Sequence, residues 1–405
     1  MSDQLRDAGF KQLTRVDAAR DRLRDAVSPH GRTGAVPLED ADGRVLAEPI
    51  TSNRNVPHYR RAAMDGFAVR AADTFGASDR SPNVLRVATG EVAPGSGVRV
   101  HTGSELPPGA DAVVMVEHVD RVGDDLEVFD AVAEGENVAP EGEDVEAGQQ
   151  LYDAGHRLRP SDLGLLKSTG VATVSVYEPP RVTVIPTGEE LVEADPKPGE
   201  VVETNGLTVS RLVERWGGDA DYQEIVTDDE TALREAVAGN LDADIVVTTG
   251  GSSVGERDLI PDVVADMGDV FVHGVALKPG HPVAMGVVED TPIIMLPGYP
   301  VACIINAVQF LRPALKWAGR MPLEEFPTVE ARLSRKIRSD VGDRTFVRVR
   351  LTDDESEPVA TPTRASGSGV LSSVALADGW VEVPESSEGI AEGETVAVQN
   401  WEWSA

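Results

Sequence analysis

Residues 241–258, LDADIVVTTGGSSVGERD, decide the fold of this chain. Residues 245–247 are a short β-branched run, which predicts a buried strand. Small residues follow at once, and Asp258 closes the loop. Glycines at the carboxyl end of a strand in an open α/β sheet let the backbone approach a phosphate, and a carboxylate there can hold a divalent cation. The stretch therefore predicts a phosphate or nucleotide loop, with a Gly/Ser surface turn as the alternative.

The chain around this loop alternates between predicted strands and helices. Apolar runs predict strands at residues 181–185, 222–226, 245–248, 270–275, 283–288 and 293–296. Helical periodicity predicts helices at residues 206–217, 230–238, 261–267 and 300–317. This alternation favours a parallel, mostly doubly wound sheet.

The remaining chain predicts further domains, so the fold class is α/β plus β. Residues 1–30 have helical spacing, and a second helix is expected at 160–167. Short apolar segments between Gly/Pro turns, within residues 51–140 and again after residue 327, predict two all-β modules. The predicted domains are a discontinuous linker domain (1–50 and 141–177), a β-rich insert (51–140), the α/β domain (178–323) and a C-terminal β domain (324–405).

Charge and cysteine content restrict the function classes. The 405 residues include 69 acidic and 37 basic ones, for a formal net charge of −32 at pH 7. This predicts a halophilic surface, with an acidic mesophilic protein as the alternative, and it argues against nucleic acid or an anionic membrane as a partner. An anionic substrate must therefore meet a local cluster of cations. One cysteine, no apolar signal core and no membrane-length apolar run predict a cytoplasmic protein without disulfides.

Four further clusters carry candidate chemistry. Asp65 precedes a glycine in RAAMDGFAVR, and Thr102 opens HTGSELPPGADAVVMVE; turn chemistry explains both equally well. PTGEEL (186–191) lies at a second strand end, so Thr187, Gly188 and Glu190 can line the same crevice as the first loop.

The fourth cluster joins residues 275–286 to residues 294–303. Lys278 stands before Pro-Gly, where it can act as a point charge for an oxyanion, and a solvated loop lysine is the alternative. His281 is either an anion donor or a turn residue. Residues 297–300, PGYP, lead into a helix whose N-terminus offers free N–H groups.

These clusters together resemble the MoeA/gephyrin E-domain family, the molybdopterin molybdenumtransferases. The matching blocks follow the family order over nearly the whole chain: PHYRRAAMDGFAVR, HTGSELPPGADAVVMVE, EGEDVEAG, PTGEEL, TTGGSSVGERD, LKPGHPVAMG, LPGYPVAC, RTFVRV and ASGSGVLSS. The resemblance implies an elongated homodimer with a three-layer α/β/α nucleotide-binding domain similar to MoaB and MogA, a β-rich insert, a mixed linker domain and a barrel-like C-terminal domain.

The family resemblance also implies a reaction and a set of site residues. Family members insert molybdate into adenylylated molybdopterin with a divalent cation, taken here as Mg²⁺, and release AMP. No catalytic triad is apparent, which predicts attack at phosphorus by an oxygen of molybdate or water. By motif position, the functional polar residues are Asp65, Thr102, Asp144, Glu190, Asp228 and Asp258, with Glu190 and Asp258 as metal ligands. The predicted nucleotide contacts are Thr187, Gly188, Gly250, Gly251, Ser252, Gly255, Pro297, Gly298 and Pro300, and the predicted molybdate contacts are Lys278, His281, Arg348 and Ser368.

Three positions depart from the family pattern. His281 replaces a common second lysine, Tyr299 replaces a common Asn, and Ala62 or Ala63 replaces a serine. Selectivity between molybdate and tungstate therefore stays open. Two other functions also stay open: a molybdopterin adenylyltransferase, which resembles the α/β domain alone, and a non-catalytic pterin or nucleotide scaffold. A docking adenylyltransferase is a further expected partner.

Overall fold

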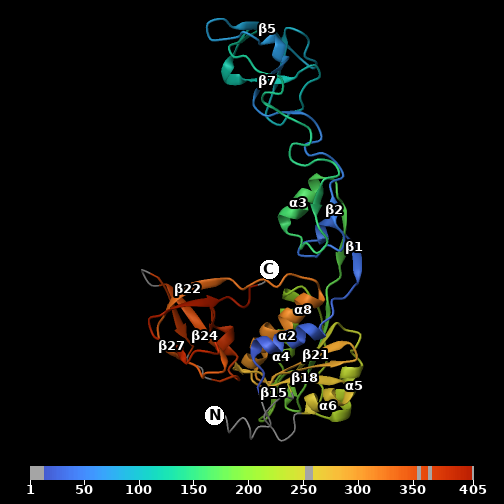
Figure 1. Cartoon of the computed structure of the whole chain (residues 1–405), viewed down its shortest axis with the longest axis vertical. Coiled ribbons are helices and arrows are strands. Elements are labelled where there is room, and N and C mark those ends of the chain that lie inside the picture. Colours follow the sequence, from blue (N-terminus) through green and yellow to red (C-terminus); the bar gives the residue numbers. More distant parts are fainter. Residues whose placement is uncertain (1–12, 251–258, 354–356, 364–366, 404–405) are drawn as a thin grey trace. The chain divides into compact units, whose positions relative to one another are not determined.

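The computed structural model describes residues 13–250, 259–353, 357–363 and 367–403 (Figure 1). The chain forms two compact units. Unit 1 contains the described residues up to Gly34 and those from Tyr177 onward, and unit 2 contains Ala35–Val176.

A six-stranded sheet forms the centre of unit 1. Its order is β16 (Asp219–Tyr222), β13 (Arg181–Pro186), β17 (Ile245–Thr249), β21 (Thr291–Leu296), β20 (Ala284–Val288) and β18 (Asp269–His273). The first four strands are parallel, as predicted. β20 runs antiparallel to β21, and β18 pairs antiparallel with β20, so β18 again has the direction of the first four strands. Only residues 289 and 290 separate β20 from β21, and Glu289 has a φ of 54°. A two-residue hairpin of this kind can join only antiparallel neighbours.

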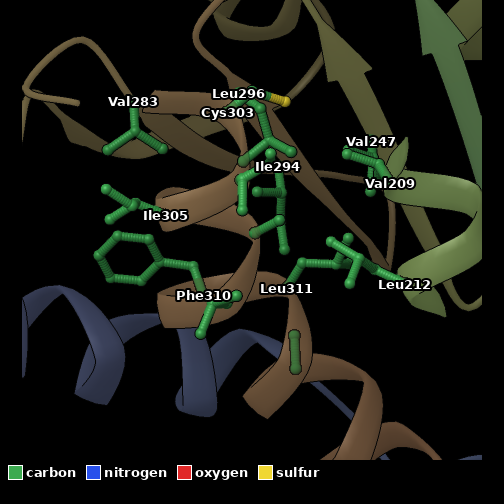
Figure 2. Close-up of a cluster of buried hydrophobic side chains, with 14 of the residues drawn as sticks. Val209, Leu212, Val247, Val283, Ile294, Leu296, Cys303, Ile305, Phe310 and Leu311 are labelled. Atoms are coloured by element: carbon green, nitrogen blue, oxygen red, sulfur yellow. The ribbon is translucent and has the colours of Figure 1, made fainter. Parts of the chain in front are cut away.

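Helices cover both faces of this sheet, which confirms the predicted three-layer architecture. Alternate residues of β17 enter different cores: Ile245 and Val247 join one, and Val246 joins the other. Figure 2 shows the first core, where side chains of β17 and β21 meet those of α4 (Asn205–Arg215) and α7 (Pro300–Asn306). The second core is built with α5 (Glu230–Ala238) and α6 (Leu259–Met267).

Helix α2 (Val16–Ala26) packs on unit 1, whereas we predicted residues 1–50 as part of the linker domain. Its apolar residues, among them Leu23, join the first core. A break in the helical segment at residues 300–318 contributes to this docking. Pro313 has no N–H to donate to the carbonyl of Gln309, so the guanidinium Nε of Arg20 donates to that oxygen at 3.0 Å. The other domain boundaries stay predictions.

The break also divides the helix predicted at residues 300–317. The segment is α7, then the π-helical turn η4 (Ala307–Leu311), then α8 (Arg312–Ala318). A strand was predicted at residues 222–226, but β16 ends at Tyr222. The sequence of β16, DADY, is mostly polar, so it lacks the apolar pattern from which a strand is predicted.

The C-terminal domain of unit 1 contains a closed barrel of five strands, which confirms the barrel-like prediction. The ring runs β24 (Arg344–Asp353), β25 (Pro358–Pro362), β22 (Thr328–Leu333), β28 (Thr395–Gln399), β26 (Gly379–Val383) and back to β24. Its interior holds a core of its own, including Val349 and Val381. On the outside, Phe346 and Trp380 join the core shared with the α/β domain.

Unit 2 contains the predicted β-rich insert and the helix α3 (Pro160–Ser168). The insert is a six-stranded sheet in the order β7 (Ala112–Met115), β4 (Gly66–Val69), β6 (Ser96–Val100), β5 (Asn83–Ala88), β9 (Asp125–Val128) and β8 (Val119–Val122). Strand β7 ends at Met115, because the chain turns there into the short 3-10 helix η3 (Val116–His118).

Candidate active site

Three neighbouring parallel strands of unit 1 end at the same edge of the sheet. Pro186 of β13 is level with Thr249 of β17, which is level with Leu296 of β21. The backbone N–H of Gly250 continues this pattern and donates to the carbonyl of Leu296 at 3.2 Å. Ligands bind at such carboxyl ends in open α/β sheets, so this edge is the candidate nucleotide shelf.

Glycine is required where the shelf is tightest. Gly250 has a φ of +135°, and a Cβ there would lie 2.0 Å from the backbone oxygen of Thr187. Gly298 approaches from the next strand end, where a Cβ would lie 3.5 Å from the Cα of Gly250. Three backbones are thus packed together without side chains between them. The predicted contacts Gly251, Ser252, Gly255 and Asp258 lie outside the described residues.

Three buried threonine hydroxyls mark the same edge. The Oγ1 atoms of Thr187, Thr248 and Thr249 have no hydrogen-bond partner among the described residues. Buried hydroxyls are normally paired, so hydroxyls left over at a strand edge are candidate donors or acceptors for a ligand. The sequence-based prediction named Thr187 as a contact but used Thr248 and Thr249 only as small residues of the loop.

Two carboxylates lie close together beside the shelf. Burial, and next the nearby Glu190 carboxylate, raise the pKa of Asp228. The Oδ1 atom of Asp228 is buried and has no partner in the part of the chain that the structure describes. An acidic pair with an unsatisfied oxygen has the donor chemistry that a hard divalent cation prefers. Among the described residues no three metal-binding side chains cluster, and Asp258 is not among those residues.

A buried glutamate positions the helix beside the shelf. Glu203 accepts hydrogen bonds from the backbone N–H of Gly206, at 2.6 Å, and from the hydroxyl of Tyr222. Burial and the bond to Glu203 raise the pKa of Tyr222 well above its usual range. Asn205, the first residue of α4, donates from its Nδ2 to the carbonyl of Gly298 at 2.7 Å. The sequence-based prediction missed this network; the ETNG stretch at a helix start was the available signal.

Apart from the shelf, unit 1 has a pocket of about 340 Å³. Three of the predicted oxyanion contacts line it: Lys278, Arg348 and Ser368. We call it the oxyanion pocket. The ammonium of Lys278 lies 2.6 Å from Asp340 Oδ2. Arg348 is only 8% exposed, its Nη1 donates to the Phe346 carbonyl at 3.3 Å, and burial lowers its pKa.

Three cations line this pocket among the described residues: Lys278, Arg338 and Arg348. Backbone pairing links the first of them to the strand that carries the last. The short strand β19 (Leu277–Lys278) pairs in parallel with β24 and places Lys278 beside Thr345. His281 does not line the oxyanion pocket. Its Nδ1 lies 3.1 Å from the Val275 carbonyl and its Nε2 lies 3.7 Å from Asp343, so the ring is held by its own loop.

The segment 297–301 connects the nucleotide shelf to the oxyanion pocket. On one side Gly298 meets Gly250, as described above. On the other side the N–H of Val301 donates to the carbonyl of Ser368 at 2.9 Å. A Cβ on Gly369 would lie 3.3 Å from the ring of Tyr299. Both features therefore border one continuous stretch of backbone within unit 1.

Unit 2 holds the remaining predicted residues. Asp65 accepts hydrogen bonds from the Thr102 backbone N–H at 2.7 Å and from its hydroxyl at 2.8 Å. These bonds, led by the one from the backbone, lower the pKa of Asp65. Glycine at position 66 is required, since a Cβ there would lie 1.9 Å from the Val114 oxygen. Asp144 is exposed, and its N–H donates to the Val56 carbonyl at 2.9 Å.

A glycine-lined strand edge beside a pocket of cations is typical of an enzyme that handles a phosphate ester together with a small oxyanion. Three family profiles match in chain order: MoeA N-terminal region (domain I and II) over residues 14–170, "Probable molybdopterin binding domain" over 183–317, and MoeA C-terminal region (domain IV) over 330–401. The chain belongs to the MoeA family of molybdopterin molybdenumtransferases.

Relatives match over nearly their full length. A molybdopterin biosynthesis protein of Methanocaldococcus jannaschii is 36% identical, covering 93% of this chain and 94% of its own. The molybdopterin molybdenumtransferase of Bacillus subtilis is 32% identical, covering 92% and 93%. The crystal structure of the MoeA protein from Pyrococcus horikoshii OT3 is 34% identical, covers 96% of this chain and 100% of its own, and has a TM-score of 0.80.

Within the described residues, no helix has both the length and the apolar character needed to cross a membrane.

Proposed function

We propose that this chain inserts molybdate, or tungstate, into adenylylated molybdopterin and releases AMP, the last step of molybdenum cofactor biosynthesis. One observation carries the proposal: the nucleotide shelf and the oxyanion pocket border the same segment, 297–301, so an adenylate phosphate and a small oxyanion can be held side by side. Proximity of this kind turns a bimolecular step into an effectively unimolecular one.

The shelf is proposed to hold the adenylate. The backbones at Gly250 and Gly298 lie close together without intervening side chains, and the unpartnered threonine hydroxyls can bind phosphate oxygens. The remaining proposed contacts are Thr187, Gly188, Gly251, Ser252, Gly255, Pro297 and Pro300.

The oxyanion pocket is proposed to hold molybdate. Lys278 and Arg348 supply charge-assisted hydrogen bonds, and the hydroxyl of Ser368 adds a neutral one. In a protein with a net charge of −32, such a local concentration of cations is what a tetrahedral dianion requires. His281 stays a predicted contact without a place in the pocket lining.

Glu190, Asp228 and Asp258 are proposed to hold Mg²⁺. The unsatisfied Oδ1 of Asp228 and the raised pKa of this residue fit a carboxylate that has a cation as its natural partner. Bound there, the cation supplies charge neutralisation for the phosphate and for the departing AMP. Asp65, Thr102 and Asp144 of unit 2, the homodimer and docking of an adenylyltransferase stay proposals from the family resemblance.

The direct test supplies the purified chain with adenylylated molybdopterin, molybdate and Mg²⁺. AMP release that depends on molybdate, with transfer of molybdenum to the pterin, is the expected result. Pyrophosphate release from Mg-ATP and molybdopterin would instead identify an adenylyltransferase. Binding without turnover in either assay would identify a scaffold.

Asp228→Asn is expected to lower the rate of AMP release by about 100-fold or more, because one charged metal ligand is lost. Binding of the nucleotide should persist, since the shelf is built from backbone groups. The measurements are single-turnover AMP release and a Mg²⁺ titration, in which the variant should need more Mg²⁺.

The matched control for this variant is Glu189→Gln, which removes a neighbouring carboxylate with an exposed side chain. Equal losses of activity in Asp228→Asn and Glu189→Gln would mean that activity falls because negative charge is removed from the region, and not because a metal ligand is lost.

Asn205→Ala is expected to raise the KM for the adenylylated substrate by about fivefold to tenfold, because a hydrogen bond to the Gly298 carbonyl is worth about 1 kcal/mol. The kcat should change less. Asn240→Ala is the control, since Asn240 Nδ2 makes a similar bond, at 2.8 Å, to the carbonyl of Ala236 away from the shelf. A KM shift of the same size in both variants would contradict a positioning role for Asn205.

A further inference from the structure

A larger pocket, of about 600 Å³, lies on the C-terminal domain next to the oxyanion pocket. Thr363 lines both pockets and forms their common wall. Arg350 lines the larger pocket and lies two residues along β24 from Arg348 of the smaller one. Residues two apart on a strand point to the same face, and their Cα atoms are roughly 7 Å apart. The two pockets are therefore neighbours along one strand.

The larger pocket is lined by cations without acids. Arg335 and Arg350 both border it, and among the described residues no carboxylate does. Neither arginine forms an ion pair with another described residue. Each instead contacts a backbone carbonyl: Arg350 Nε donates to Leu376 O at 2.9 Å, and Arg335 Nη2 donates to Pro362 O. Since a guanidinium carries five N–H donors, most of them stay available to a ligand. Two such arginines are conspicuous in a chain of net charge −32.

A buried hydroxyl gives independent support for a ligand. Ser373 lines the pocket and is only 4% exposed, yet its Oγ has no hydrogen-bond partner in the described part of the chain. Leaving a buried hydroxyl unsatisfied is costly, so a polar group that fills the pocket would remove this cost. Further hydroxyls come from Ser334 and Thr361, which hydrogen-bond to each other at 2.9 Å.

We propose that this pocket is a second site for a tetrahedral oxyanion, where molybdate is loaded before it reaches Lys278 and Arg348. Arginine forks and hydroxyls are the donors that such a dianion takes. A pterin or a nucleobase fits less well, because no aromatic side chain lines the pocket. The choice of molybdate rests on the proposed function, whereas the choice of an oxyanion rests on the pocket alone.

The test is calorimetric titration of the full chain with molybdate, phosphate and sulfate. The wild type is expected to bind two molybdates per chain. Arg350→Gln and Ser373→Ala should each lose or weaken one of them about tenfold, and Lys278→Gln should weaken the other. Arg350→Gln should also raise the KM for molybdate about tenfold while kcat at saturating molybdate stays unchanged. Arg332→Gln is the control, since it removes an equal charge from β22, where Arg332 pairs with Glu357 at 2.6 Å.

Three results are decisive. Titrations of Arg350→Gln that match those of the wild type would overturn the site. Sulfate or phosphate binding as tightly as molybdate, with an unchanged KM in Arg350→Gln, would mean an adventitious ion only and would overturn the loading role. Molybdate binding that depends on Arg350 in a wild type that releases no AMP would support the site while refuting the proposed function.

Discussion

Lys278→Gln is expected to lower kcat/KM for molybdate by about 10- to 100-fold, because hydrogen bonds to charged groups are worth about 1.5–3 kcal/mol. The ammonium of Lys278 lies in the oxyanion pocket, and the substitution keeps most of the side-chain length while removing its charge. Saturating molybdate should restore much of the rate. AMP release measured against molybdate concentration gives both parameters.

The partner of Lys278 provides a control with the opposite sign. Asp340 holds the ammonium at 2.6 Å and therefore competes with an incoming dianion. Lys278 lowers the pKa of this carboxyl, so Asp340 stays charged at neutral pH. Asp340→Asn should improve apparent molybdate affinity several-fold, since a neutral amide competes less. Losses of similar size in Asp340→Asn and Lys278→Gln would show that the ion pair serves structure and not substrate binding.

Trp380→Ala is expected to destabilise the C-terminal domain by about 3–5 kcal/mol, as usual for truncating a fully buried tryptophan. The indole of Trp380 is stacked on Trp401, with ring centroids 5.1 Å apart, and meets Phe346 edge-on at 5.4 Å. Its Nε1 donates to Gln399 at 2.9 Å. Since Trp380 pairs across the strands with Arg348, the oxyanion pocket should also loosen.

Hydrogen exchange resolved by peptide is the suitable measurement, because a multidomain chain need not unfold in one step. Protection should fall in β24, β26 and β28, while β13 and β17 stay protected. Trp317→Ala is the control: Trp317 is half-buried on α8 and meets the Arg24 guanidinium at 5.0 Å, so a smaller loss is expected. Uniform loss of protection over unit 1 would contradict a local role for Trp380.

Much of the fold was predictable because its strands carry strong local signals. Residues 245–248 are β-branched and apolar, and the structure has β17 over Ile245–Thr249. The antiparallel direction of β20 was not predicted, since it depends on a two-residue turn at Glu289. The docking of α2 was also missed. Periodicity identifies the apolar face of a helix but not the core that this face covers.

Part of the candidate site followed from the family resemblance. Lys278, Arg348 and Ser368 were named from their motifs, and they line one pocket. His281 was named with them, but a carbonyl of its own loop holds the ring, and no pattern in the sequence reveals such a contact. Asn205 was missed because its partner, the carbonyl of Gly298, lies 93 residues away in the chain. Glu203 was missed although Gly206, which donates to it, lies only three residues on.

The parallel pairing of β19 with β24 has a consequence for motion. Lys278 lies in the segment that connects β18 to β20 of the α/β sheet, yet its backbone pairs with β24, the barrel strand that carries Arg348. A shift of the barrel relative to the α/β sheet would therefore have to break this pairing or bend the loop, so the spacing between these two residues resists such a shift.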